Sequence, residues 1–342
     1  MKLFIMVGPP GSGKSYASKK LKLIYGAEYF SSDLYRVKVC GDINCQTRNQ
    51  EVFNTLYNDL VFTLRQGKNC IFDATNCNRK SRKTIINMVK NIEGIEIIAY
   101  VLRTPKIICY ERDSKRDRRV GDDVIDKFIN MYEFPQRFEG FTDIILDGSY
   151  WNPQITDYDN KWQCFKRTMD KWDQENPHHI YTLGKHCNEL AKLTLSSNNV
   201  NLYTAGLLHD IGKLYTQQKD NQEIAHYYSH DNVGTYYILS ELSDYKKFFP
   251  NQETLEYILF IVNYHMKGHK DWRSDKYRQL VGDQWYNDLI FFANCDMEGS
   301  GTESIHSELM KWIKSDKLTL NEIRNKPEYK DLILKNTNFV EI

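Results

Sequence analysis

Residues 3–15 read LFIMVGPPGSGKS and contain the pattern G-x-x-x-x-G-K-[ST] from Gly8 to Ser15. An apolar segment at 3–7 precedes the pattern, and a helix-like segment at 16–23 follows it. In this strand–loop–helix context, backbone N–H groups surround a polyphosphate and the helix N-terminus adds partial positive charge. The stretch therefore predicts a nucleoside triphosphate site, with a chance match in a Gly-rich turn as the alternative.

Individual residues of this loop have expected roles. Lys14 is expected to reach the β- and γ-phosphates of ATP, and the Ser15 hydroxyl is expected to ligate Mg²⁺. ATP and Mg²⁺ are therefore the ligands expected for this domain. The loop residues expected to bind the nucleotide are Gly8, Gly11, Ser12, Gly13, Lys14 and Ser15.

The composition is that of a globular protein with two domains. The chain has 342 residues, and single cores rarely grow beyond about 250 residues. The formal net charge is +1, so binding of nucleic acid would need a local basic patch. The eight cysteines form no C-x-x-C pair, which indicates reduced thiols, and no apolar run reaches the length of a membrane span. We therefore expect a cytoplasmic protein that does not contact a membrane.

Apolar segments alternate with helical patterns over residues 1–150. This alternation predicts an α/β domain in which helices cover both faces of a parallel sheet. Ligands of such a sheet bind beyond the carboxyl ends of the strands. Strands are expected at 3–7, 28–31, 69–73, 95–102 and 143–146, and helices at 14–23, 33–39, 49–66, 79–91, 105–116 and 122–132.

The stretch S-S-D-L-Y-R at 31–36 follows the first predicted helix. Asp33 in this stretch is expected to accept the proton of an attacking hydroxyl group. Arg36 lies one turn later on the same helix face and is expected to bind an acceptor phosphate. Capping of the helix N-terminus is the alternative role for Asp33.

Two further motifs also lie at ends of predicted strands and helices. Asp73 ends an apolar strand and is expected to hold Mg²⁺ through water or to orient an arginine; capping of the helix from Arg79 is the alternative. Arg112, Arg116 and Arg119 have the spacing of one helix face, and Arg116 is the first candidate for neutralising the transferred phosphoryl group. A solvated helix of mixed charge is the alternative for these arginines.

Together these four motifs resemble the phage polynucleotide 5′-kinase family over about residues 1–135. The resemblance implies that Asp33 activates the 5′-hydroxyl of a nucleic acid strand. It also implies that Arg36 contacts the 3′-phosphate of the acceptor and that Arg116 stabilises the transition state. The D-x-D-x-T phosphatase motif of familiar phage members does not occur in this sequence.

The second half of the chain has a different pattern. Turn residues at 147–153 end the first domain, and residues 151–160 are expected to form a linker. From 161 to 342 the pattern is helical, with closing helices expected over 301–342. All nine histidines lie at or beyond His178, which predicts a second chemistry on a second domain.

Polar residues occupy apolar faces of several helices predicted in this half. One of them is the pair His209-Asp210, within LLHDIGK at 207–213. A single residue of this kind is usually a hydrogen-bonded core residue, but buried charges on several helices need partners or a metal. The expected ligands of one divalent ion are His186, His209, Asp210 and Asp296, and Asp210 is expected to bridge to a second ion held by His230 and His265. The ions considered are Mn, Co, Ni, Fe, Zn and Mg.

The order H…HD…H…H…D resembles the HD superfamily of metal-dependent phosphohydrolases over about residues 175–300. Residues 176–179 resemble the N-P-x-H segment of several members, which implies that His179 lies near the substrate phosphate. Lys213 is expected to neutralise that phosphate, with an ordinary cation near a helix end as the alternative. The remaining histidines His226, His269 and His306 fit no ligand position and are expected at the surface.

The combination resembles known fusions of an HD domain with a polynucleotide kinase. It implies a bifunctional end-healing enzyme for nucleic acid, and RNA is favoured because many RNA cleavages leave a 5′-hydroxyl and a cyclic phosphate. Its expected partners are RNA or DNA ends and a ligase that acts downstream. One alternative is a nucleoside kinase joined to a nucleotidase. The other is an ATP sensor that regulates an HD phosphohydrolase, although intact Lys14, Ser15, Asp33 and Arg116 argue against sensing alone.

Overall fold

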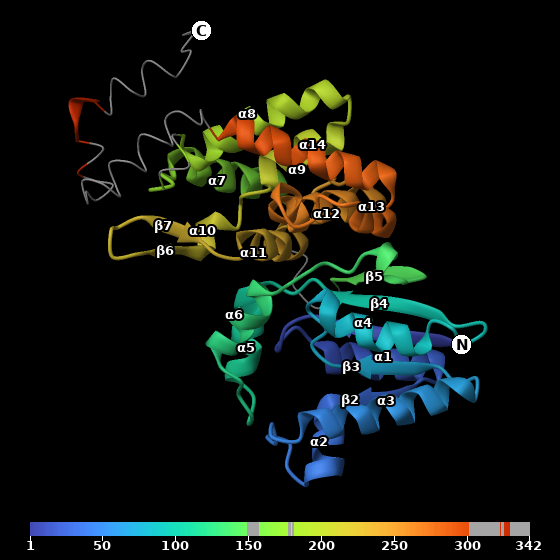
Figure 1. Ribbon diagram of the computed structural model, residues 1–342. Coiled ribbons are helices and arrows are strands. Elements are labelled where there is room, and N and C mark those ends of the chain that lie inside the picture. The colour runs from blue at the N-terminus through green and yellow to red at the C-terminus, as the bar shows by residue number, and fades with distance from the viewer. Residues whose placement is uncertain (149–156, 177–178, 180, 301–321, 323–324, 329–342) are drawn as a thin grey trace. The chain divides into compact units, whose positions relative to one another are not determined.

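A computed structural model describes residues 1–148, 157–176, 179, 181–300, 322 and 325–328 (Figure 1). The chain divides into two compact units. The first comprises Met1–Thr156 with Leu239–Glu241, and the second comprises Asp157–Ile238 with Leu242–Ile342. None of the described helices has the length and the apolar composition that crossing a membrane requires.

The first unit is built on a sheet of five parallel strands in the order β2-β3-β1-β4-β5 (Figure 1). The strands are β1 (Lys2–Val7), β2 (Glu28–Ser31), β3 (Cys70–Asp73), β4 (Glu96–Leu102) and β5 (Asp143–Asp147). The helices are α1 (Lys14–Tyr25), α2 (Ser32–Cys40), α3 (Asn49–Arg65), α4 (Arg79–Val89), α5 (Lys106–Ser114), α6 (Asp122–Asn130) and the short η1 (Arg137–Glu139). The predicted parallel α/β architecture is confirmed.

Alternation along β1 explains why helices cover both faces of the sheet. Phe4 and Met6 pack with Ala17 and Leu21 of α1 in one buried cluster. Because successive strand residues point to opposite faces, Leu3, Ile5 and Val7 are buried on the other face. Helix α3 contacts β2, β3 and α4, and its residues Val52, Leu56, Leu60 and Leu64 are buried at helical spacing.

One predicted helix is shorter than expected. Helix α5 ends at Ser114, whereas the sequence pattern predicted a helix over 105–116. The Asp113 carboxylate, which is 2% exposed, accepts hydrogen bonds from the backbone N–H groups of Val120 and Gly121. These bonds turn the chain into a loop at 115–121. Arg116 and Arg119 therefore lie in this loop, and the prediction that they share a helix face with Arg112 was wrong.

The second unit is helical, as predicted. Its helices are α7 (Tyr158–Lys171), α8 (Leu183–Thr194), η2 (Leu195–Ser197), α9 (Val200–Leu208), α10 (Lys213–Thr216), α11 (His230–Tyr237), η3 (Ile238–Leu242), α12 (Gln252–His269), α13 (Asp275–Val281) and α14 (Asp283–Gly299). A short antiparallel hairpin of β6 (Gln217–Lys219) and β7 (Ala225–Tyr227) is added between α10 and α11. Helices α8, α9, α12 and α14 pack against one another, which brings distant polar residues into one core.

The predicted linker and the predicted closing helices flank the helices of the second unit, and the structure describes only parts of them. Residues 158–160, predicted as linker, already belong to α7, because the Asp157 side chain accepts a hydrogen bond from Asn160 N and caps this helix. The rest of the predicted linker, from 151 to 156, lies outside the described residues. The closing helices predicted over 301–342 lie almost entirely outside them as well.

Candidate active sites

The phosphate loop connects β1 to α1. Gly13 precedes α1 with a φ of 98°, and Gly11 has a φ of 80°, a region of backbone conformation that favours glycine. A Cβ atom on Gly11 would lie 2.3 Å from the carbonyl oxygen of Cys109 in α5. The Lys14 ammonium group donates to the carbonyl oxygens of Gly8 and Pro9, at 2.9 Å each, so it lies across the loop. The loop thus has the local geometry that the sequence pattern predicted.

Asp73, at the carboxyl end of β3, joins this loop. Its Oδ2 accepts hydrogen bonds from Ser15 Oγ at 3.2 Å and from Tyr29 Oη at 2.5 Å. Burial and the Asp73 carboxylate raise the pKa of Tyr29, so the phenol stays a donor. Asn78, and not Asp73, caps α4 by accepting from Ser81 N at 2.8 Å. A hydroxyl and a carboxylate side by side are suitable oxygen ligands for Mg²⁺.

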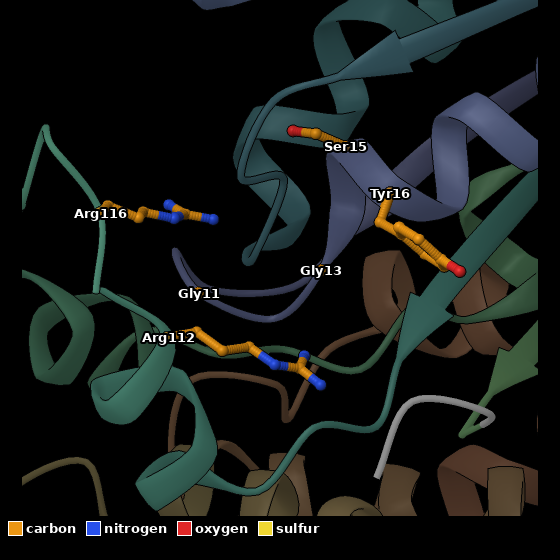
Figure 2. A pocket seen from close by; sticks show the side chains of 6 residues that line it. All are labelled: Gly11, Gly13, Ser15, Tyr16, Arg112 and Arg116. Atoms are coloured by element: carbon orange, nitrogen blue, oxygen red, sulfur yellow. The ribbon is translucent and has the colours of Figure 1, made fainter. Parts of the chain in front are cut away.

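A cavity of about 410 Å³ lies over the loop (Figure 2). Its walls include Gly11, Gly13, Ser15, Tyr16, Arg112 and Arg116. In Figure 2 the Arg112 and Arg116 side chains lie on opposite sides of the loop segment between Gly11 and Gly13. Arg112 Nη1 donates to Ser12 O at 3.4 Å, and the Ser12 side chain is fully buried. Tyr16, half exposed at this cavity, was missed because a helix pattern does not show which face meets a ligand.

Asp33 lies in the first turn of α2, where Ser31 rather than Asp33 caps the helix. Ser31 is the partner of Asp73 in the pairing of β2 with β3, so α2 begins beside the Ser15–Asp73 pair. The Asp33 side chain is 54% exposed, and its Oδ2 lies 3.4 Å from Arg118 Nη1. The register of two parallel strands thus brings this carboxylate to the same sheet edge as the phosphate loop.

Arg36 is held by its own surroundings. Its Nε donates to Cys45 O at 3.1 Å and its Nη2 donates to Asn49 Oδ1 at 2.8 Å. Its Nη1 donates to Ser32 O at 3.3 Å, and the residue is only 9% exposed. Arg36 does not line the cavity over the loop. Its contact with an acceptor phosphate therefore stays a prediction.

In the second unit, the four residues predicted for one metal ion converge. His186 Nε2 lies 3.2 Å from His209 Nε2, 3.3 Å from Asp210 Oδ2 and 3.1 Å from Asp296 Oδ1. His209 Nε2 lies 3.2 Å from Asp210 Oδ2 and 3.5 Å from Asp296 Oδ1. Neighbouring ligands about 2.1 Å from an octahedral ion are about 3.0 Å apart. These spacings are close to those of an octahedral site.

A second cluster shares Asp210. Its Oδ1 lies 3.1 Å from His230 Nε2 and 3.8 Å from His265 Nε2, and these two imidazole nitrogens are 3.2 Å apart. Oδ2 of the same carboxylate faces the first cluster, so the two clusters share Asp210. That Asp210 bridges two ions stays a prediction. The two clusters come from α8, the end of α9, α11, α12 and α14.

The outer nitrogens of the four imidazoles settle which nitrogen faces the centre. Each Nδ1 lies 2.7–3.2 Å from a backbone carbonyl oxygen, which can only accept. Each Nδ1 therefore carries a proton and donates it to the carbonyl oxygen, and each Nε2 faces the centre. The Nε2 atoms of His186 and His209 are 3.2 Å apart, as are those of His230 and His265. Within each pair the lone pairs would repel each other unless a proton or a cation lies between them. The carbonyl partners are those of Gly299, Gly206, Tyr227 and Val262, for His186, His209, His230 and His265 respectively.

Charge leads to the same conclusion. Asp210 is 2% exposed and Asp296 is 7% exposed, and a buried carboxylate needs a cationic partner. Although burial opposes it, His209 and Lys213 keep the pKa of Asp210 well below its usual range. Burial lowers the pKa of His265 to about 3, so this imidazole is neutral and can act as a ligand. The donor set fits one or two divalent ions.

Lys213 begins α10 and is 4% exposed, so it is not an ordinary cation near a helix end. Its ammonium group contacts Asp210 Oδ2 at 2.7 Å, Gln174 Oε1 at 2.9 Å and His179 Nε2 at 3.1 Å. Burial and the Lys213 charge hold the pKa of His179 well below its usual value. Since His179 Nε2 accepts from Lys213, its Nδ1 carries the proton, and this buried N–H has no hydrogen-bond partner within the described residues. Gln174 was missed, because nothing in its sequence context signals this contact.

His269 corrects the sequence prediction. It was expected at the surface, but its side chain is 17% exposed and its Nε2 donates to Asp296 Oδ2 at 2.9 Å. His269 lies four residues after His265 on α12, a spacing that could have revealed it. His226 pairs with Asp220 at 2.9 Å and is 37% exposed, in agreement with a surface position. His306 lies outside the described residues.

Comparison with protein families divides the chain in the same way. Residues 3–135 match the family described as AAA domain, and residues 178–296 match the family described as HD domain. The chain thus joins a P-loop kinase domain to an HD domain, as predicted. The first domain implies ATP and Mg²⁺ as ligands, and the second implies a divalent metal.

One relative covers part of the chain. A protein of Acanthamoeba polyphaga mimivirus, named as a bifunctional polynucleotide phosphatase/kinase, is 25% identical over 179 residues, or 50% of this chain. The match spans only 38% of the length of the mimivirus protein.

Solved structures with a similar chain path include a chain of the Pnkp1/Rnl/Hen1 RNA repair complex. It is 24% identical, with a TM-score of 0.35 over 38% of this chain and 43% of the other. A shikimate kinase from Acinetobacter baumannii is 16% identical, with a TM-score of 0.32 over 47% of this chain and 90% of the other.

Proposed function

We propose that this chain heals the ends of broken nucleic acid. Its first domain transfers the γ-phosphate of ATP to a 5′-hydroxyl end. Its HD domain hydrolyses a 2′,3′-cyclic phosphate or a 2′- or 3′-phosphomonoester. RNA is the favoured polymer, because many RNA cleavages leave a 5′-hydroxyl and a cyclic phosphate. A ligase that joins the healed ends is the expected partner.

The observation that carries this proposal is that one chain contains two groups of residues suited to phosphate chemistry, one in each domain. Asp33, in the first turn of α2, lies at the same end of the sheet as the phosphate loop. In the HD domain, six His and Asp side chains converge. The name of the mimivirus relative, a bifunctional polynucleotide phosphatase/kinase, supports the pairing of these two activities on polynucleotides.

In the kinase reaction, Asp33 accepts the proton of the 5′-hydroxyl group. The hydroxyl oxygen forms a bond to the γ-phosphorus while the bond from that phosphorus to the bridging oxygen breaks, and ADP leaves. Lys14 and Arg116 neutralise the charge of the transferred group, and Arg112 holds the nucleotide beside the loop. Ser15 and Asp73 are the side chains available for the Mg²⁺ that accompanies ATP.

In the hydrolase reaction, His186, His209, Asp210 and Asp296 would hold one divalent ion, and Asp210, His230 and His265 would hold a second. Bound ions of this kind activate water and neutralise a phosphate ester. The His179 Nδ1–H, which has no partner in the part of the chain that the structure describes, is available to donate to a substrate oxygen. Lys213, fixed by Gln174 and Asp210, adds a positive charge beside it.

The first test is phosphorylation of a panel of acceptors. The protein is incubated with radiolabelled ATP and Mg²⁺ and with 5′-hydroxyl RNA, 5′-hydroxyl DNA or free nucleosides. We expect labelled RNA, and labelling of nucleosides alone would replace this proposal with that of a metabolic kinase. If ATP binds but neither kind of acceptor is labelled, the first domain acts as an ATP sensor.

The second test separates the two sites. Asp33→Asn is expected to abolish 5′-phosphorylation and to leave hydrolysis of a cyclic phosphate end intact. Asp210→Ala is expected to have the converse effect. Equal loss of both activities in either variant would contradict two independent sites, and hydrolysis that survives a chelator would contradict the metal centre.

A further inference from the structure

The loop between α5 and α6 is closed by its own backbone contacts. The buried Asp113 carboxylate accepts hydrogen bonds from Val120 N and Gly121 N, at 3.0 Å each from its Oδ2. Arg116 N also donates to Asp113 O at 3.0 Å. The loop at 115–121 is therefore bonded to Asp113 at both ends, through the backbone carbonyl at its start and through the carboxylate at its end.

Two arginines of this loop contact different parts of the kinase domain. Arg116 lines the cavity over the phosphate loop, as Figure 2 shows. Arg118 instead contacts α2 and the segment that follows it. Its Nη1 lies 3.4 Å from Asp33 Oδ2, its Nε donates to Asn44 Oδ1 at 2.9 Å and its Nη2 donates to Ile43 O at 3.3 Å. All three guanidinium nitrogens are thus engaged on the Asp33 side.

We propose that Arg118 is a positioning residue of the acceptor site, an inference that rests on the proposed role of Asp33 as the base. Arg118 holds Oδ2 of the Asp33 carboxylate, and Oδ1 remains to receive the proton of the acceptor hydroxyl group. The short loop also links this contact to Arg116. One loop thus places Arg116 at the nucleotide cavity and Arg118 at Asp33.

The contact is too exposed to be explained by folding stability. The Arg118 side chain is 36% exposed and that of Asp33 is 54% exposed, and exposed ion pairs contribute little to stability. Arg36, the arginine predicted beside Asp33, is committed to Cys45 O, Asn49 and Ser32 O. Among the described residues, Arg118 is therefore the cation that forms an ion pair with the proposed base. Its effect is expected in the rate of phosphoryl transfer and not in the stability of the fold.

The test compares Arg118→Ala with Arg119→Ala, a control that removes the neighbouring exposed arginine of the same loop. With a 5′-hydroxyl oligonucleotide, Arg118→Ala is expected to lower kcat about 10- to 100-fold, the effect of a slightly misplaced catalytic group. The KM for ATP and the melting temperature are expected to change little. Added guanidinium is expected to restore part of the kcat of Arg118→Ala, but not that of Asp33→Asn.

Hydrogen exchange of the free protein provides a measurement that needs no substrate. Arg118→Ala, but not Arg119→Ala, is expected to speed amide exchange in residues 41–45 and 114–121, because Arg118 joins these two segments. Unchanged exchange would overturn the inference whether or not the proposed reaction exists. A higher KM for phosphate-bearing acceptors at unchanged kcat would also overturn it, since Arg118 would then bind the acceptor. If the unaltered protein phosphorylates no acceptor, the proposed function fails, and the base that Arg118 is inferred to position fails with it.

Discussion

Replacement of His269 is the sharpest test of the metal centre. His269 is not one of the proposed metal ligands, but it forms a hydrogen bond with one of them, Asp296. Asp296 directs Oδ1 toward His186 and His209 and accepts from His269 Nε2 through Oδ2. Without this hydrogen bond, the carboxylate can rotate and needs to be reordered when an ion binds. We expect His269→Ala to weaken binding of divalent metal without removing a ligand.

The size of the effect follows from the geometry of the pair. The His269–Asp296 hydrogen bond is 2.9 Å long, and the two side chains are 17% and 10% exposed, so solvent screens it little. A hydrogen bond to a charged group contributes about 1.5–3 kcal/mol. Loss of a residue that supports a metal ligand typically costs about 10- to 100-fold in metal affinity, or roughly 1.4–2.7 kcal/mol. The two estimates agree, so we expect a loss of about 10- to 100-fold.

Titration of the metal-free protein with Mn²⁺ in a calorimeter measures this affinity directly. The matched control is His226→Ala, because His226 pairs with Asp220 at the same distance of 2.9 Å but at an exposed position away from the centre. The control is expected to bind Mn²⁺ like the unaltered protein. Equal Mn²⁺ affinity of His269→Ala and the control would refute the assignment of Asp296 as a ligand oriented by His269.

Three further predictions concern the first domain. Lys14→Ala should abolish detectable binding of ATP with Mg²⁺ in a calorimeter while leaving hydrolysis by the HD domain unchanged; retained ATP affinity would contradict the role of the loop. Gly11→Ala should destabilise the fold by about 1–3 kcal/mol in chemical denaturation, because its Cβ would meet Cys109 O, whereas Gly94→Ala, also at positive φ but in open space, should cost less. Arg82→Ala should destabilise by about 3–5 kcal/mol, because it leaves the buried Glu139 carboxylate unpaired, and the exposed Arg48→Ala should have a much smaller effect. Similar losses of stability in Arg82→Ala and Arg48→Ala would contradict the burial of the Arg82–Glu139 pair.

Each strand of the first domain begins and ends within one residue of the bounds predicted from the sequence. Strand boundaries are local features, since apolar runs such as 3–7 and 69–73 end at turn residues. The end of α5 was not predictable in this way. It depends on hydrogen bonds from Val120 and Gly121 to Asp113, seven and eight residues apart, and no helical periodicity records such contacts.

The same distinction applies to the candidate sites. Polar residues on apolar helix faces identified the six residues that converge in the HD domain, because a buried charge stands out against its neighbours. Residues that act through another residue do not stand out. Gln174 reaches Lys213 from 39 residues away, and Arg118 reaches Asp33 from a loop. Only His269 carried a usable signal, because it shares a helix face with His265.

The two sites solve opposite electrostatic problems, and this difference explains why their sequence signals differ. The phosphate loop receives a polyanion, so it needs backbone N–H groups, Lys14 and arginines, with only Ser15 and Asp73 as ligands for an ion that arrives with ATP. The HD centre receives cations before it receives a phosphate, so it needs buried imidazoles and carboxylates from several helices. A contiguous loop motif can encode the first kind of site. The second kind exists only when α8, α9, α11, α12 and α14 pack together, so folding of this domain and assembly of its metal centre depend on the same core.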